Sequence, residues 1–322
     1  MKHHVIAGAS ALMLAGAAAP AQTLTMATIE PSLGPAIVMS TFANLVNDEL
    51  DDVEIEVAGG GAATLHMVEV ARGNLDMSMT SPSIYPLMQK GIAMYANEPE
   101  APELSENLGL LMWFPYGQYH YTVRPDSGIE TLDDIEGATA FIGPAGGGAY
   151  ATAKGWIEAT TGLVAGEDYE AITANWATGF QSFLDGKIDV YVNGCLDPCQ
   201  QFLQITETED IRFIGPEDWS GEAVDKFLGK FRNLAEVKPG AYDGQVNEEP
   251  VMSHDTNVGI GVRMDLDEDT VYRITKAFWE NLQSITSEAP WAKAISIETA
   301  VQDLGMPLHP GARRYYEEVG AL

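Results

Sequence analysis

The spacing of apolar residues along the chain predicts alternating strands and helices. Residues 23–29 and 53–58 have the short, β-prone pattern of strands, and residues 36–50 carry apolar side chains at the spacing of an amphipathic helix. A second helix is predicted over 63–73 and a third strand over 75–80. Alternation of this kind favours an α/β fold with largely parallel strands.

The same alternation starts again in the middle of the chain. Strands are predicted over 138–143, 169–174 and 188–194, and helices over 150–162 and 178–186. The restart suggests that the chain builds two α/β units one after the other. Its 322 residues are enough for two lobes with cores of their own.

Two segments, 71–83 and 184–196, have the same order of features. Each contains the end of a helix, a Gly-x-x-Asp sequence, a buried strand and a polar loop. Gly73 and Gly186 stand where glycine commonly ends a helix, and the aspartate three residues later starts a strand. This repetition of a supersecondary unit predicts two similar lobes.

A strand predicted over 119–123 leaves the first unit just before the second begins, so we expect a hinge there. A later strand, 256–263, returns the chain to the first unit. One lobe is therefore expected to comprise residues 22–122 and 256–322, and the other residues 123–255.

The sequence AGGGA occurs twice, at 58–62 and at 145–149; we call these segments the first and second glycine corners. Each follows a predicted strand and leads directly into a predicted helix. The N-terminus of a helix exposes unpaired N–H groups with partial positive charge, and glycines let a bound group approach them closely. Each corner could also be no more than a tight turn.

Two equivalent corners in matched lobes favour one shared binding cleft, because ligands of open α/β sheets bind at the carboxyl ends of strands. Neither corner has the G-K-[ST] ending of a phosphate loop. The predicted main-chain ligand groups are those of Gly60, Gly61, Gly146, Gly147 and Gly148.

Several polar or aromatic side chains follow predicted strand ends, where they could contact a ligand or cap a loop. The predicted ligand-binding side chains are Thr28, Ser32, Ser81, Tyr85, Trp176 and Asn193. Glu30 either binds a ligand ammonium group or faces solvent. His120, in the predicted hinge strand, is interpreted as a packed, hydrogen-bonded histidine.

The net charge is −30, from 47 acidic and 17 basic residues. Nucleic acid is a poor partner for such a surface, because phosphate binding requires a basic patch. An anionic membrane surface is disfavoured for the same reason. Few basic residues are available to recognise a ligand carboxylate, so main-chain amides are the better candidates.

The first residues read as a secretory signal peptide over 1–21, with a basic start, a short apolar run and cleavage after Ala21. The expected location is the periplasm. Cys195 and Cys199 would then meet an oxidising environment, where a short-loop disulfide is expected. Their spacing is neither the C-x-x-C redox motif nor a metal motif, and no metal or cofactor is expected.

A secreted α/β hydrolase or transferase is the alternative from another class. It would need a nucleophile with a base, or a metal cluster. The chain has no G-x-S-x-G and no H-E-x-x-H sequence. Four histidines lie beyond the predicted signal peptide, far apart in sequence: His66, His120, His254 and His309. We expect a binding protein rather than an enzyme.

The chain resembles the TAXI-type solute-binding proteins of TRAP transporters over nearly all of its predicted mature length. The segments that carry the resemblance, in this order and spacing, are YHYTVRPDSGIETLDDIEG, FIGPAGGGAYATAKGWIEATTGL, FLDGKIDVYVNG, PGAYDGQ, DEDTVYRITKAFWENL and PLHPGARRYYEEVG. The chain departs from the family in its first loop, 27–34, which contains Glu30 where the family is often rich in glycine. Cys195 and Cys199 are also unusual for their loop.

The resemblance implies a two-lobed periplasmic-binding-protein fold, in which each lobe is a mostly parallel sheet flanked by helices and hinge strands join the lobes. It implies a small carboxylate or amino-acid ligand, glutamate-like, held between the lobes and delivered to a TRAP membrane permease. A monomer is expected. A sensor that presents its bound ligand to a receptor would share this fold and remains an alternative.

Overall fold

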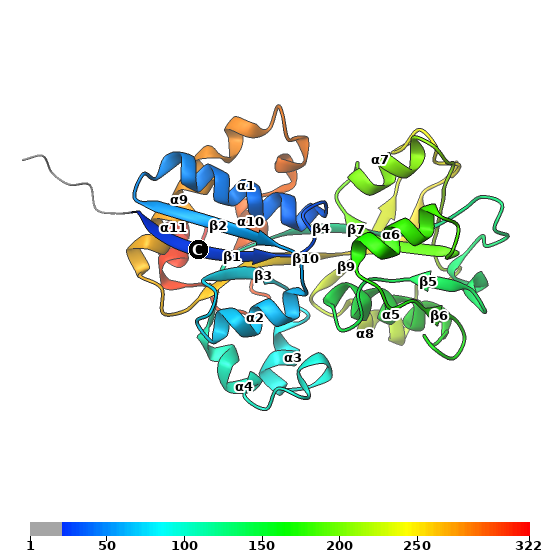
Figure 1. The fold of residues 1–322 in the computed structure, drawn as a ribbon, viewed down its shortest axis with the longest axis horizontal. Coiled ribbons are helices and arrows are strands. Elements are labelled where there is room, and N and C mark those ends of the chain that lie inside the picture. The colour runs from blue at the N-terminus through cyan, green and yellow to red at the C-terminus, as the bar shows by residue number, and fades with distance from the viewer. Residues whose placement is uncertain (1–20) are drawn as a thin grey trace, which may run out of the picture.

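The computed structural model describes residues 21–322, so the predicted signal peptide, except for Ala21, lies outside the described part. Figure 1 shows two bodies side by side. The first lobe contains α1 (Gly34–Glu49) and α2 (Ala63–Ala71), and the second lobe contains α5 (Gly148–Thr161) and α6 (Trp176–Leu184). No helix of residues 21–322 combines the length and apolar character needed to span a membrane.

The other elements are as follows. The strands are β1 (Gln22–Thr28), β2 (Val53–Gly59), β3 (Met77–Thr80), β4 (Leu108–Val123), β5 (Thr139–Phe141), β6 (Glu170–Ala171), β7 (Val190–Cys195), β8 (Arg212–Ile214), β9 (Arg232–Val237) and β10 (Val251–Arg263). The remaining α-helices are α3 (Tyr85–Lys90), α4 (Ala101–Leu104), α7 (Gln200–Thr206), α8 (Glu222–Leu228), α9 (Glu268–Asn281), α10 (Ile297–Ala300) and α11 (Pro310–Glu318).

One continuous sheet runs through both lobes in the order β2-β1-β3-β10-β4-β7-β5-β6, with β8 beside β4 and β9 beside β10. Within the first lobe β1 pairs in parallel with β2 and β3, and within the second β5 pairs in parallel with β6 and β7. The pairs that involve β4 and β10 are antiparallel. The parallel alternation predicted from the sequence is therefore confirmed within each lobe.

Each lobe buries the apolar face of its helices against the sheet. In the first lobe α1 buries Met39, Phe42 and Val46, whose three- and four-residue spacing places them on one side of the helix. Phe42 packs on Phe278 of α9, with ring centroids 5.1 Å apart. In the second lobe α5 buries Trp156 completely.

The repeated Gly-x-x-Asp units form the same structure in both lobes. In the first lobe Asp76 Oδ2 accepts hydrogen bonds from the backbone N–H (2.7 Å) and the hydroxyl (2.9 Å) of Thr25. In the second lobe Asp189 Oδ2 accepts from the N–H (2.8 Å) and hydroxyl (2.7 Å) of Thr139. Each aspartate thus ties the start of one strand to its parallel neighbour, which confirms the predicted repeat.

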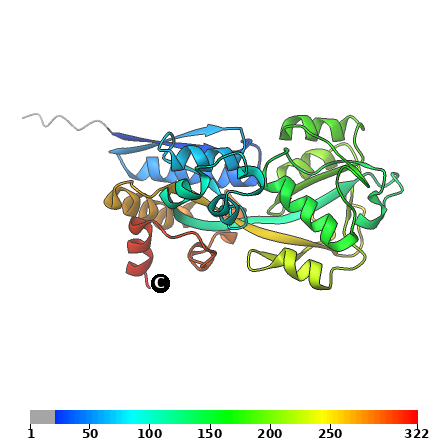
Figure 2. The same cartoon turned by 90° about the horizontal axis from the view of Figure 1, so that it is seen from below.

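The strands β4 and β10 belong to both lobes, and we call them the hinge strands. The first part of β4 pairs with β10, and from Gln118 onward β4 pairs with β7 of the second lobe. The first part of β10 pairs with β9, and its last part pairs with β3 of the first lobe. Figure 2 shows both strands running from one lobe into the other.

The ladder between the hinge strands is broken where they pass between the lobes. Thr256 pairs with Gly117 and Asn257 pairs with Pro115, so the ladder skips Tyr116. An extra residue of this kind forms a β-bulge, which bends a strand and redirects its side chain. Gly117 has φ +104°, a conformation that glycine adopts without steric cost.

Three parts of the fold differ from the sequence prediction. β4 begins at Leu108, well before the predicted start at 119. The prediction missed residues 108–114 because they are buried throughout and lack the alternation of a half-buried strand. The loop-rich region after 210 contains β8, α8 and β9. The strand predicted over 169–174 is reduced to the two residues of β6.

Gly117→Ala is expected to lower the free energy of unfolding by at least about 3 kcal/mol, because a Cβ at Gly117 would overlap the backbone of Cys195 and Leu196 and would also require a strained φ. Gly128→Ala is the matched control. Gly128 also has a positive φ (+79°), but nothing lies within 4 Å of the added Cβ, so a loss of about 1–2 kcal/mol is expected. Urea unfolding measures both, and equal losses would contradict the prediction.

Candidate functional site

The structure brings the second glycine corner against the helix that follows the first corner. The hydroxyl of Thr64, in the first turn of α2, donates a hydrogen bond of 3.3 Å to the carbonyl of Gly146 in the second corner. A Cβ placed on Gly148 would lie 3.2 Å from Ile84 Cγ1 of the first lobe. The first lobe and the second corner are thus in direct contact.

A cavity of about 60 Å³ lies at this contact. Both lobes and both hinge strands contribute to its wall, and the lining residues are Ile29, Ala63, Thr64, Met67, Met79, Thr80, Ser81, Ile84, Tyr116, Tyr119, Pro144, Gly147, Gly148, Ala149, Thr152, Trp176, Thr256 and Val258. Ligand pockets commonly enclose about 300–1,000 Å³. A solute of more than a few atoms therefore requires the lobes to move apart.

The helices α2 and α5 begin at the cavity without side-chain caps. Their N-cap residues are Ala62 and Gly147, and neither makes a side-chain hydrogen bond to the first turn. The first N–H groups of an α-helix have no partner inside the helix. Lining residues Ala63 and Gly148 are the first helical residues, so main-chain donors and the positive ends of two helices are available at the cavity.

Tyr116 contributes to the cavity wall a polar side chain that has no hydrogen-bond partner among the described residues. Its side chain is buried, with 4% exposure, and its hydroxyl makes no hydrogen bond within the described residues. The ring stacks on Tyr119 with centroids 5.5 Å apart. An unsatisfied buried hydroxyl costs free energy, so this group is well placed to serve a ligand.

Trp176 separates the cavity from a larger groove. The groove has a volume of about 910 Å³ and lies between the loop after β1 and helices α6 and α7; Trp176 lines both spaces. Asn175 Oδ1 accepts a hydrogen bond of 2.8 Å from the Thr178 N–H, which fixes the start of α6. The indole also packs edge-on against Phe141, with centroids 5.5 Å apart.

The predicted glycines have different places in this arrangement. Gly147 and Gly148 line the cavity, and Gly146 supplies the carbonyl that Thr64 contacts. Gly60 and Gly61 do not line it. The N–H of Gly60 is already bound to the Ile29 carbonyl at 3.1 Å, and both glycines have positive φ angles that shape the turn.

Ser81 and Trp176 are the predicted side chains that line the cavity. Ser32 and Glu30 instead line the groove beyond Trp176, where the Ser32 carbonyl accepts a hydrogen bond of 2.9 Å from Gln201. Glu30 therefore lies outside the cavity wall.

Three predicted side chains are buried away from the cavity and contact other groups of the protein, although Asn193 Oδ1 has no hydrogen-bond partner among the described residues. The Thr28 hydroxyl faces Met39 Sδ at 3.6 Å, and the Tyr85 hydroxyl donates to the Ser105 carbonyl at 3.1 Å. Asn193 Nδ2 lies 3.8 Å from Cys199 Sγ. The cavity residues that sequence reasoning missed come chiefly from the hinge strands, namely Tyr116, Tyr119, Thr256 and Val258.

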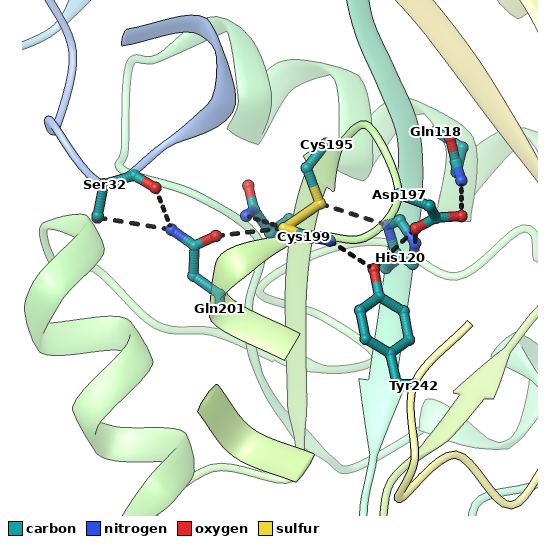
Figure 3. Close-up of a disulfide and its surroundings, with 9 residues drawn as sticks. Ser32, Gln118, His120, Cys195, Asp197, Cys199, Gln201 and Tyr242 are labelled. Carbon is teal, nitrogen blue, oxygen red and sulfur yellow. Dashed lines mark hydrogen bonds and ion pairs between the residues drawn. A yellow bond between two sulfur atoms is a disulfide. The ribbon is translucent and has the colours of Figure 1, made fainter. Parts of the chain in front are cut away.

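A disulfide joins Cys195 and Cys199 beside the hinge, in the loop between β7 and α7 (Figure 3). Asp197 lies inside this loop and accepts hydrogen bonds from His120 Nε2 (2.9 Å), the Tyr242 hydroxyl (2.7 Å) and Gln118. His120 is fully buried and hydrogen-bonded, as predicted. The network ties the second-lobe end of β4 to the disulfide loop.

The charge of Asp197 is stabilised in the folded protein. Burial raises the pKa of this carboxyl, but the hydrogen bonds from His120, Tyr242 and Gln118 outweigh burial, and the pKa lies below its ordinary value. In the part of the chain described, residues 21–322, no group of three or more His, Cys, Asp or Glu side chains is arranged to hold a metal ion.

Asp197→Asn is expected to lower the free energy of unfolding at pH 7 by about 2 kcal/mol, because charge-assisted hydrogen bonds are lost. The folded-state pKa is depressed, so this stabilisation is present above about pH 4, the value of an unfolded aspartate, and is lost as the pH falls through the folded-state pKa. The stability difference between wild type and variant should therefore shrink on acidification.

Urea unfolding at a series of pH values measures this difference. Asp185→Asn is the control, because Asp185 is a solvent-exposed carboxylate paired with Lys187, and a much smaller loss is expected there. A difference at Asp197 that grows toward low pH would contradict the interpretation.

Comparison with known proteins agrees with this architecture. The model of the NMT1-like family matches residues 36–320. A solved structure of a periplasmic transporter is 14% identical, with 94% of this chain and 96% of that chain covered and a TM-score of 0.57. A protein from Bordetella bronchiseptica RB50 is 14% identical, with 92% and 82% covered and a TM-score of 0.52. These similarities confirm the α/β fold predicted from the sequence, and the chain belongs to the NMT1-like family.

Proposed function

We propose that the protein is the extracytoplasmic solute-binding component of a TRAP-type transporter of the TAXI kind. In this proposal a small organic acid or amino acid binds between the lobes, and the loaded protein delivers it to the membrane permease. The protein acts in the periplasm as a monomer and performs no chemical reaction on its ligand.

The observation that carries the proposal is the cavity shared by both lobes and the hinge strands. A ligand that touches both lobes stabilises the closed arrangement over any open one, which is a shift of population toward the closed form. We propose that residues 22–122 with 256–322 move relative to residues 123–255. The hinge strands are the connections that would bend, at the bulge beside Tyr116.

The chemistry of the cavity supports an acidic ligand. Two uncapped helix N-termini and several hydroxyl groups face the same small space, and these are donors suited to a carboxylate. The TRAP assignment and the permease partner rest on the family resemblance of the segments quoted above. The periplasmic location rests on the predicted signal peptide.

The cavity gives little support to an enzyme. Of the described residues, those that line it include no histidine, cysteine, aspartate or glutamate, so a nucleophile there would have no adjacent side-chain base. A ligand-presenting sensor would use the same cavity, and no observation favours it over transport.

Native mass spectrometry of the freshly purified protein, followed by thermal unfolding with a panel of organic acids and amino acids, tests the proposal. We expect one or more solutes to bind saturably and to raise the melting temperature. A ligand at one hundred times its Kd should add about 2.7 kcal/mol to the free energy of unfolding. The absence of both a co-purified solute and any saturable binding would overturn the proposal.

Trp176→Ala is expected to weaken binding of the identified solute about 10–100-fold, because it opens the cavity into the groove and removes an aromatic wall. Trp219→Ala is the matched control. Trp219 is 41% exposed and lines a different surface hollow of the second lobe, so an unchanged Kd is expected. Isothermal titration measures both, and equal effects would contradict the placement of the ligand.

A further inference from the structure

The wall of the cavity carries no charged side chain among residues 21–322. Its larger aliphatic groups are Ile29, Met67, Met79, Ile84 and Val258, and its polar side chains are hydroxyls and the Trp176 indole. Glu30, whose carboxylate was a candidate to bind a ligand ammonium group, lines the groove on the other side of Trp176.

This wall offers few favourable interactions to a ligand ammonium group. Burying an unpaired cation is costly, and the positive ends of α2 and α5 would repel it. Two nearby carbonyls already accept hydrogen bonds, since the Gly146 carbonyl accepts from Thr64 (3.3 Å) and the Pro144 carbonyl accepts from the Gly147 N–H (3.0 Å). The donors that remain favour a negatively charged group.

Tyr116 is an independent indication of a ligand. Tyr116 lines the cavity, and its buried hydroxyl makes no hydrogen bond of ordinary geometry within the described residues, although the backbone of Gly194 lies close to it. Most buried hydroxyls in proteins are satisfied. The bulge at the hinge places this residue outside the regular ladder. A carboxylate oxygen in the cavity would give the hydroxyl the acceptor that it lacks.

Arg232 lies behind this wall with no acidic partner. It stands opposite Thr256, a cavity residue, in the pairing of β9 with β10. Its guanidinium lies 4.5 Å from the centroid of the Phe227 ring, and Nη1 donates to the Phe227 carbonyl at 2.8 Å. Nε is buried without a partner, and no ion pair of the described residues includes Arg232.

The positive charge of Arg232 acts on the cavity wall. Burial raises the pKa of Tyr119 to about 12, and the charge of Arg232 opposes that rise. Arg232 is half-buried, and a partly desolvated cation without a counterion is unfavourable, so an anion in the cavity would compensate it. One cation balances one negative charge, so a ligand with two carboxylates would leave one of them without compensation.

From these observations we infer that the ligand is a short-chain monocarboxylate with an apolar body and no ammonium group, bound by the helix N-termini and the Tyr116 hydroxyl, with Arg232 supplying the balancing charge. The inference rests on the proposed function, because it names the ligand class of the same cavity. The volume of about 60 Å³ leaves little space for a long solute between the lobes as they lie here.

Isothermal titration at pH 7.5 and fixed ionic strength tests the inference with four matched groups of solutes. They are monocarboxylates (propionate, isobutyrate, pyruvate), amino acids (alanine, 2-aminobutyrate, glutamate), dicarboxylates (succinate, glutarate) and a neutral amide (isobutyramide). We expect the tightest binding from a monocarboxylate. Binding of an amino acid, a dicarboxylate or the amide with equal or greater affinity would overturn the inference and leave the solute-binding function standing. Binding of none, with no co-purified solute, would overturn both.

Tyr116→Phe separates a role in binding from a role in folding. Because the hydroxyl has no protein partner, its removal should leave the melting temperature of the ligand-free protein unchanged or raised, while monocarboxylate binding weakens about tenfold. Tyr85→Phe is the matched control. It removes a hydrogen bond to Ser105 away from the cavity, so the melting temperature should fall and the Kd should stay the same. The reverse pattern would refute the role of Tyr116.

Arg232→Gln should weaken monocarboxylate binding at least about tenfold and reduce the preference for isobutyrate over isobutyramide. Arg212→Gln is the control, because Arg212 is already paired with Glu130 at 3.0 Å, and both affinity and preference should be retained. An unchanged preference in a folded Arg232→Gln protein would show that Arg232 does not provide the balancing charge.

Discussion

The two lobes share the strands β4 and β10, and this continuity constrains everything else in the molecule. Because each strand is hydrogen-bonded in both lobes, the lobes cannot slide past one another without breaking ladders; they can change their relative angle by bending where the ladder is interrupted. The ladder is interrupted at Tyr116 and again at Leu111, and the side chain of Tyr116 also forms part of the cavity wall. In the proposed closure the strand segment that bends and the cavity wall share Tyr116, so a ligand that fills the cavity would act directly on the bend.

Charge is distributed unevenly between the surface and the interior of this acidic protein. The chain carries a net charge of −30, and several of its basic residues are paired on the surface, such as Arg72 with three glutamates and Arg273 with Asp52. Such exposed pairs contribute little individually and are screened by salt. Arg232 is different, because it is held beside the uncharged cavity and packs on an aromatic ring. In the proposed binding mode, an acidic exterior and the half-buried Arg232 together would favour an anion in the cavity while discouraging non-specific anion binding outside.

Local backbone chemistry made the repeated units and the glycine corners predictable. The features that depend on long-range strand pairing could not be predicted from the sequence. Gly73 and Gly186 end helices in either lobe, and the corners start helices, because these requirements involve only neighbouring residues. The full length of β4 and the place of Tyr116 depend on which strands pair with it, and spacing along the chain does not encode that pairing. Thr28, Tyr85 and Asn193 were predicted to bind a ligand because they lie near predicted strand ends. In the structure each of these side chains contacts another group of its own lobe.

The matched threonine–aspartate ties of Thr25 with Asp76 and Thr139 with Asp189 fasten parallel strands inside each lobe and cross no boundary between them. Each lobe consequently keeps its internal geometry whatever angle it makes with the other. Structures of the protein captured in different degrees of opening should superpose closely when one lobe is aligned at a time, and the whole rearrangement should reduce to a single rotation.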